Sequence, residues 1–222
     1  MFDIRLAESQ EDLEALYRFR YKIYVEEMGR VQHDADHLNK KIRDDLDDGG
    51  HNLLAFKQGK LVGAARINLN QSISPFYLDF YKIFEQKGTT TNNVSIVTRL
   101  MVDAEVRNTT LTYRIFIACY EFGLWRGVKY NFVDCNDHLV DIVISFGHFY
   151  YIGKASHPEY GLVNPLMLDL HDGSNLRLVK SPFLSSFLKW KAGQEQYKTE
   201  SNTSHSDVVV GGRHLKLVSS FK

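Results

Sequence analysis

The sequence predicts one mixed α/β domain with an antiparallel front half and a strand–helix–strand–helix rear half. Apolar residues across positions 2–170 recur in the order strand, helix, two strands, strand, helix, strand, helix, strands, if a short aromatic helix is set aside. A turn around Gly59 joins the strands predicted at 51–56 and 61–69. A helix at 110–127 separates the strands predicted at 94–102 and 130–134. These observations together define the fold class.

Each front-half element has its own local signal. Residues 2–6 alternate like a short strand, and Ser9, with Asp12 three residues later, predicts the start of a helix that runs to about Gly29. Residues 30–50 are polar and densely charged without a clear period, which predicts a long functional loop with a helical turn. Pro75 opens the short aromatic helix, and a polar run at 88–93 follows it.

Glycines mark the helix ends of the rear half. The helix at 110–127 ends in Arg126 and Gly127, and Gly147 ends a helix at 137–146. Late strands are predicted at 149–152 and 162–170, and a further helix at 182–192. We assign residues 1–193 to the domain and 194–222 to a polar linker followed by a C-terminal hairpin around Gly211 and Gly212.

Composition and charge exclude several classes of protein. The 222 residues are 44% hydrophobic and 24% charged, an ordinary globular mixture that needs neither disulfides nor a metal to fold. The 27 basic and 27 acidic residues cancel, so no global field attracts nucleic acid or anionic lipid. No secretory signal or bilayer-spanning run is visible, and the two cysteines make no metal cluster. We therefore expect a soluble, cytoplasmic protein with no transmembrane segment and no nucleic-acid partner.

Three arginines stand among apolar residues. Arg20 lies on the apolar face of the first helix, while Arg66 and Arg99 lie inside apolar strands. A guanidinium in such a place needs a carboxylate partner or must reach water along the edge of the core. The acidic stretch with Asp44 and Asp47 supplies partners, unless it is a solvated surface run. We interpret the three arginines and the acidic stretch as one charged network beside a pocket.

A second candidate site precedes the helix at 110–127. This segment carries Arg107, Thr109, Thr110 and Thr112. Free N–H groups at a helix start, together with hydroxyls, suit a phosphate, and the alternative is a plain threonine-capped helix. Asn136 lies between the next strand and helix, where it reads as an Asx cap.

The order of these elements resembles the GNAT acyltransferase fold. Five segments add a more specific pattern: RYKIY at 20–24 followed by Glu27-Met28-Gly29, DDLD at 44–47, LVGAARINL at 61–69, IVTRL at 96–100 and NPLMLDL at 164–170. Together they resemble the motifs of acyl-homoserine-lactone synthases and their N-acyl amino acid synthase relatives. RNTTLT at 107–112 and NDHLVDIVISFGH at 136–148 stand where the GNAT fold has its pyrophosphate loop and its Asn…Tyr…Gly-Phe segment.

The resemblance implies an N-acyltransferase that moves a fatty acyl group from a thioester to the amine of an amino acid or similar small molecule. It implies that the backbone of the strand at 99–102 supplies oxyanion and pantetheine contacts, and that Thr98, Leu100 and Val102 bind substrate. The donor phosphate would be held by Arg107, Thr109, Thr110, Thr112 and Asn136. Asp44 and Asp47 would lie near the ammonium, and Arg20, Arg66 and Arg99 would organise them and meet the acceptor carboxylate. Tyr24 would bind substrate.

The sequence also departs from the family pattern. Thr110 and Thr112 replace the loop glycines and crowd the backbone approach of coenzyme A phosphates, so acyl carrier protein is the favoured donor over acyl-CoA. Val143 takes the place of the family tyrosine that protonates the leaving thiolate. Arg30 takes the place of the family tryptophan, and this second substitution argues against the homoserine-lactone branch. Ile96 replaces the expected glutamate.

The substitution at Ile96 leaves the general base open. Glu27, Asp44 and His51 are the candidates for this role, acting directly or through water.

Two other functions stay open from the sequence. One is a non-catalytic module that binds an acyl carrier or acyl chain, which the altered glycines and the missing glutamate and tyrosine favour. The other is an acetyl-CoA-dependent GNAT acetyltransferase. The aromatic stretch at 76–84 either lines an acyl tunnel or supplies ordinary core aromatics, and the second reading is the favoured one.

Overall fold

The computed structural model describes residues 1–203. The chain divides into two compact units, Met1–Phe187 and Leu188–Lys222. The first unit contains the whole sheet. The described part of the second unit is helical and continues α6, Leu184–Thr203.

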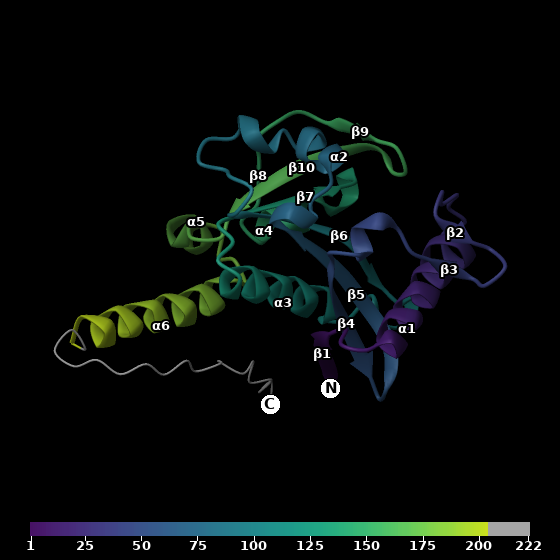
Figure 1. The fold of residues 1–222 in the computed structure, drawn as a ribbon, viewed down its shortest axis with the longest axis horizontal. Coiled ribbons are helices and arrows are strands. Elements are labelled where there is room, and N and C mark those ends of the chain that lie inside the picture. Colours follow the sequence, from purple (N-terminus) through teal and green to yellow (C-terminus); the bar gives the residue numbers. More distant parts are fainter. Residues whose placement is uncertain (204–222) are drawn as a thin grey trace. The chain divides into compact units, whose positions relative to one another are not determined.

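The first unit is built on a mixed, mostly antiparallel sheet with the strand order β1-β4-β5-β6-β7-β10-β8 and with β9 paired to β10 (Figure 1). The strands are β1 Phe2–Leu6, β4 His51–Lys57, β5 Lys60–Leu69, β6 Val94–Val102, β7 Tyr130–Cys135, β8 Phe149–Tyr150, β9 Ala155–His157 and β10 Gly161–Asp169. Within this sheet every pair is antiparallel except β6 with β7. The predicted fold class is therefore confirmed.

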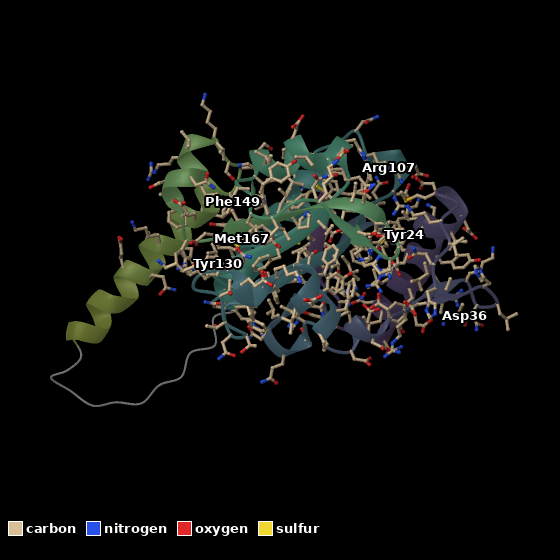
Figure 2. The ribbon with its side chains drawn as sticks, turned by 90° about the horizontal axis from the view of Figure 1, so that it is seen from above. Tyr24, Asp36, Arg107, Tyr130, Phe149 and Met167 are labelled. Carbon is tan, nitrogen blue, oxygen red and sulfur yellow. The ribbon has the colours of Figure 1, made fainter. Side chains whose placement is uncertain are left out.

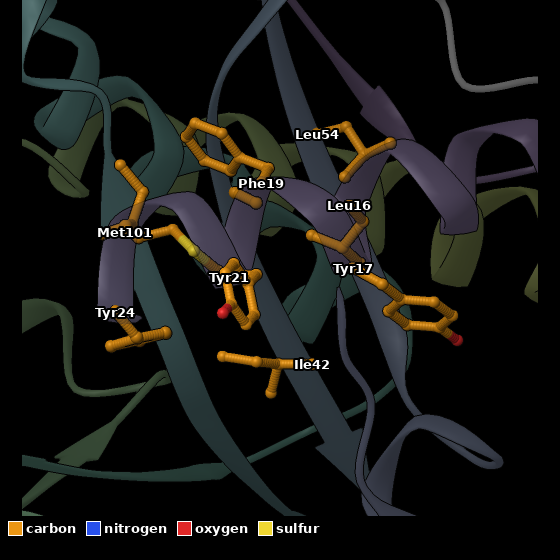
Figure 3. Packing of buried hydrophobic residues seen from close by; sticks show 10 residues of the cluster. Leu16, Tyr17, Phe19, Tyr21, Tyr24, Ile42, Leu54 and Met101 are labelled. Carbon is orange, nitrogen blue, oxygen red and sulfur yellow. The ribbon is translucent and has the colours of Figure 1, made fainter. Parts of the chain in front are cut away.

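Helices cover both faces of the sheet. On one face, α1 (Gln10–Tyr21) buries Leu16 against Leu54 and Ala64 in a cluster that Figure 3 shows closely. On the opposite face lies α3 (Leu111–Trp125), as Figure 1 shows. Gly63 allows α3 to approach, because a Cβ there would come within 2.8 Å of the Ile115 side chain. We call these the α1 face and the α3 face.

The short aromatic helix α2 (Pro75–Phe80) covers the α1 face farther along the sheet. Its neighbour Tyr81 packs in a second cluster with Ile96 and Phe132. Ile96 pairs with Phe132 and with Asn68, so these three side chains share one face. The remaining helices of the first unit include α4 (Val140–Ser145) and α5 (Gly173–Leu178).

The structure differs from the sequence predictions in several local elements. The first helix passes from α1 into a π-helical stretch, Lys22–Glu27, before Gly29 ends it with a φ of 63°. The loop at 30–50 contains the paired strands β2 (Ala35–Asp36) and β3 (Lys41–Ile42), which at two residues each are too short to leave a period.

Elements of the C-terminal region also differ. The short elements β9 (Ala155–His157) and α5 (Gly173–Leu178) were not predicted from the sequence. The linker expected from residue 194 is helical as far as Thr203. The hairpin expected around residue 211 lies outside the described residues, and the boundary after 193 stays a prediction. None of the helices within residues 1–203 has both the length and the apolar content to cross a membrane.

Candidate active site

A bulge in β6 creates the site. Ala64 of β5 pairs with Met101, and Arg66 pairs with Thr98, so Arg99 and Leu100 together lie opposite Ala65. Arg99 adopts a φ of 54°, a left-handed conformation that is costly for a residue with a side chain. Bulges and left-handed residues of this kind concentrate at functional sites, because they redirect a strand and its side chains.

The bulged strand separates from β7 and leaves a cavity of about 320 Å³. The two strands pair only over Val94–Ile96 with Tyr130–Phe132. Beyond that point the cavity is walled by residues 97–102 of β6 and by residues 133–136, where β7 ends. Backbone N–H and C=O groups of β6 on this side therefore face the cavity in place of a neighbouring strand. Tyr24 and Arg107, both labelled in Figure 2, also line it.

The α1 face beside the cavity carries the charged network that the sequence predicted. Arg20 donates to both carboxylate oxygens of Asp47 at 2.6 and 2.8 Å, and both side chains are 0% exposed. Arg66 also contacts Asp47, at 3.2 Å, and forms an ion pair with Asp44. Arg99 reaches the other oxygen of Asp44 at 2.9 Å. These five side chains therefore meet, although their chemical roles stay a prediction.

The ion pairs set the protonation of this network. Burial raises the pKa of Asp47, but the hydrogen bonds from Arg20 and the charges of Arg20 and Arg66 outweigh burial and lower it to about 2. In the same way, burial opposes the charges of Arg66 and Arg99 at Asp44, and its pKa is lowered. Both carboxylates are thus ionised and already engaged by guanidinium groups.

Arg99 connects the cavity to a second, open groove. Its guanidinium donates to Gln32 Oε1 at 2.5 Å and lies 3.5 Å from the Glu159 carboxylate. The open groove, on the side of α2, is lined by Arg99 and by the carboxylates of Asp34, Asp44, Asp45, Asp48 and Glu159. Tyr77 borders both spaces. The α1 face of the site is therefore polar and rich in carboxylates.

On the α3 face the lining is mostly apolar. Phe116 of α3 and Ile142 and Val143 of α4 line it, so the valine that replaces the family tyrosine does lie at the cavity. Arg107 stands nearby, where its Nε donates to the carbonyl oxygen of Val102 at 3.0 Å and its guanidinium pairs with Glu27.

Only some of the residues predicted to bind the donor phosphate lie together at the cavity. Thr112 and Asn136 line the cavity with Arg107. Thr110 occupies the N-cap position of α3 without a side-chain capping bond, and the hydroxyl of Thr109 donates to the carbonyl oxygen of Val106 at 2.7 Å. Asn136 precedes a 3-10 turn but makes no side-chain cap, unlike the Asx cap expected from the sequence.

The candidates for the general base have different surroundings. Glu27 is paired with Arg107, and Asp44 is held between two arginines. His51 lies at the start of β4 with its ring 5.0 Å from that of Phe122, near the C-terminal end of α3, and it does not line the cavity. The prediction that grouped His51 with the site is therefore not supported by its position.

Several cavity residues were not predicted from the sequence, and among them is Asp134, near the end of β7. The hydroxyl of Tyr81 donates to Asp134 Oδ1 at 2.5 Å. Burial raises the pKa of this carboxyl, and the hydrogen bond from Tyr81 opposes that rise only in part. A carboxylate at the C-terminal end of a strand, followed by Asn136, was the signal available in the sequence.

The aromatic stretch at 76–84 is divided between roles. Tyr81 and Ile83 are fully buried core residues, whereas Phe76 and Phe84 are exposed. Tyr77 alone of this stretch borders the cavity within the described residues. Most of the buried side chains in this stretch are therefore ordinary core residues, as the favoured prediction had it.

Comparisons with known proteins agree on this fold. FeeM, an N-acyl amino acid synthase from uncultured soil microbes, has a TM-score of 0.64 at 12% identity, covering 81% of this chain and 97% of its own. BjaI, a CoA-dependent acyl-homoserine lactone synthase solved with SAM and isopentyl-CoA, has a TM-score of 0.61 at 20% identity, covering 78% and 84%. The acyl-homoserine lactone synthase LasI has a TM-score of 0.62 at 13% identity, covering 77% and 90%.

At these identities the structural likeness shows the fold alone, and a search of curated proteins gave no match. The family model of the N-acyl amino acid synthase FeeM, however, matches residues 15–168, which is more than half of the chain. The chain therefore belongs to the FeeM family of N-acyl amino acid synthases, and it is an acyltransferase.

Proposed function

We propose that this protein transfers a fatty acyl chain from a thioester to the amine of an amino acid or a similar small amine, with acyl carrier protein preferred over coenzyme A as the donor. The observation that carries the proposal is the cavity between β6 and β7, which lies between two chemically different faces of the sheet. Each face suits one substrate.

The α3 face suits the donor. Phe116 and Val143 give an apolar wall for an acyl chain, and Arg107 with the N-terminus of α3 suits a phosphate group. Thr110 carries a side chain at the helix start, where close backbone approach to a bulky nucleotide donor would need a glycine. A carrier protein presents only its phosphopantetheine arm, which supports our choice of donor.

The α1 face suits the acceptor. Asp44 and Glu159 border the open groove and attract an ammonium group, while Arg99 stands between them, facing both the groove and the cavity. A likeness in fold to BjaI, which was solved with SAM and isopentyl-CoA, is consistent with two substrates meeting on this scaffold.

The proposed reaction forms one bond and breaks another. The free amine attacks the thioester carbonyl, a C–N bond forms, the C–S bond breaks, and the products are an amide and the free pantetheine thiol. Backbone N–H groups of residues 99–102 that point away from β5 supply donors for the developing oxyanion, because β7 does not pair with this part of β6.

Mass spectrometry of thioester turnover tests the proposal. The purified protein is incubated with a pool of amino acids and with matched long-chain acyl-carrier protein, long-chain acyl-CoA or acetyl-CoA. We expect an N-acyl product that forms fastest from the carrier protein, is lost in Arg99→Ala and is kept in Arg43→Ala, whose side chain is exposed.

Other outcomes would contradict the proposal. Product from acetyl-CoA alone would identify an acetyltransferase, and donor binding without any product would identify a binding module. A faster reaction with acyl-CoA would overturn the choice of donor and leave the reaction class intact.

A further inference from the structure

We infer that Asp134 is the general base that takes a proton from the attacking amine. This inference rests on the proposed function, because it assigns a residue to that reaction. Among the described residues that line the cavity, Asp134 alone carries a carboxyl group.

Asp134 lies on the acceptor side of the sheet. Side chains alternate along β7, so Asp134 shares the face of Phe132, which pairs with Ile96 on the α1 face. Arg66, paired with Thr98 of β6, belongs to this same face. The carboxylates of the open groove that pair with Arg66 and Arg99 and the side chain of Asp134 therefore lie on the same face of the sheet.

A buried hydroxyl holds the Asp134 carboxylate in place. Tyr81 is 0% exposed and donates to Oδ1. A carboxylate has four lone-pair positions on its two oxygens, so this single bond leaves capacity to accept a proton from an amine. The base is thus positioned by one neutral donor, whereas Asp44 and Asp47 are each held by two guanidinium groups.

The titratable groups that face Asp134 leave it without a firm cationic partner. They are Tyr77 and Tyr81 from the α2 region, Tyr151 from the segment after β8, His157 from β9 and the neighbouring Cys135. The Nδ1 atom of His157 accepts from the Glu159 N–H at 3.1 Å, and burial lowers the pKa of His157, so its imidazole is neutral near neutral pH. The tyrosines are neutral there too, because burial raises the pKa of each.

These surroundings make Asp134 a stronger base than the paired carboxylates. Ion pairing keeps the pKa of Asp44 and Asp47 low, which weakens them as proton acceptors, whereas burial raises the pKa of Asp134. As the C–N bond forms, the amine proton passes to Asp134. It then passes to the departing pantetheine thiolate or to solvent, so that the carboxylate is regenerated.

The test compares Asp134→Asn with Asp141→Asn, a matched change on an exposed residue of α4. We expect Asp134→Asn to lower kcat by about 10²–10⁴-fold with little change in the KM of the donor, and Asp141→Asn to behave as wild type. The loss should shrink for a hydrazide acceptor, because its nitrogen is unprotonated at neutral pH and depends less on a base.

Tyr81→Phe gives a second readout that does not depend on Asp134→Asn folding. Loss of the hydroxyl removes a bond that favours the charged carboxylate, so the pKa of Asp134 rises and the acidic limb of the pH–rate profile moves to higher pH. Circular dichroism checks the fold of each variant.

The outcomes separate this inference from the proposed function. If wild type forms N-acyl product and folded Asp134→Asn keeps kcat within threefold with an unchanged acidic limb, Asp134 is not the base, although the reaction stands. If Asp134→Asn does not fold, an acidic limb that stays in place in Tyr81→Phe overturns the inference. If wild type forms no N-acyl product with any donor, the proposed function and the base role fall together.

Discussion

The buried pair of Arg20 and Asp47 gives a sharp prediction for stability. Asp47→Asn keeps the size of the side chain but removes the charge that faces the guanidinium at 2.6 and 2.8 Å. Arg20 would keep Asn52 as an acceptor at 3.0 Å but would lose its closest countercharge at a position that is 0% exposed. Breaking one side of such a pair costs about 3–5 kcal/mol, so we expect the free energy of unfolding to fall by about that amount.

Urea unfolding followed by circular dichroism measures this change, with Asp45→Asn on the exposed side of the same turn as the control. The control should stay within about 0.5 kcal/mol of wild type. A loss below about 1 kcal/mol in Asp47→Asn would refute the reasoning, because it would mean that the pair contributes as little as an exposed one.

Acid unfolding gives the same prediction a second test. The pKa of Asp47 is lowered from 3.8 to about 2, so its contribution is complete above pH 3.8 and is lost as pH falls through about 2. A difference of this size corresponds to about 2–3 kcal/mol. As pH falls from 3.8 to about 2, the free energy of unfolding of wild type should therefore fall more steeply than that of Asp47→Asn. Equal slopes for the two proteins would contradict the lowered pKa of Asp47.

Three further predictions concern the substrates. Arg99→Lys replaces a guanidinium that contacts Gln32 and Asp44 with a single ammonium group. We expect kcat/KM for the acceptor to fall by about tenfold or more while the KM of the donor is unchanged. Equal losses for both substrates would contradict a role of Arg99 in acceptor binding. Phe116→Leu shortens a cavity wall and should shift products toward longer acyl chains in a mixed-donor competition read by mass spectrometry, and an unchanged chain distribution would contradict this. Thr110→Gly should raise the rate with acyl-CoA relative to acyl-carrier protein, and a constant ratio of the two rates would show that this side chain does not select the donor.

The sequence predicted the parts of the molecule whose physics is local. The strand at 94–102 agrees with β6 at both ends, because a run of β-branched residues specifies its own conformation. The buried arginines were predicted to meet carboxylates, and Arg20 and Arg66 do so, since a guanidinium cannot be buried unpaired. The apolar neighbours of each arginine in the sequence were sufficient for this prediction.

The features that the sequence did not predict depend on tertiary contacts. The left-handed Arg99 has no glycine or asparagine to signal it, and it lies in the bulge that β6 forms against β5, beyond the end of the β6–β7 pairing. The surroundings of Asp134 come from Tyr81, which lies 53 residues earlier in the chain. The role of His51 could not be predicted, because a histidine at the start of a strand does not reveal which other elements will pack against it. In the structure its ring lies beside that of Phe122 in α3.

The proposed base role of Asp134 would also account for the isoleucine at position 96, where the resemblance to the family implies a glutamate. Ile96, which stands at the place of that glutamate, is fully buried on the α1 face and pairs directly with Phe132 of β7. Asp134 lies two residues beyond Phe132 on the same face, about 6.6 Å farther along the strand and beside the cavity. Positions 96 and 134 thus lie on the same face of neighbouring strands. A shift of the base from β6 to β7 would therefore keep it on the acceptor face of the sheet, while Ile96 packs in one buried cluster with Tyr81, whose hydroxyl donates to Asp134.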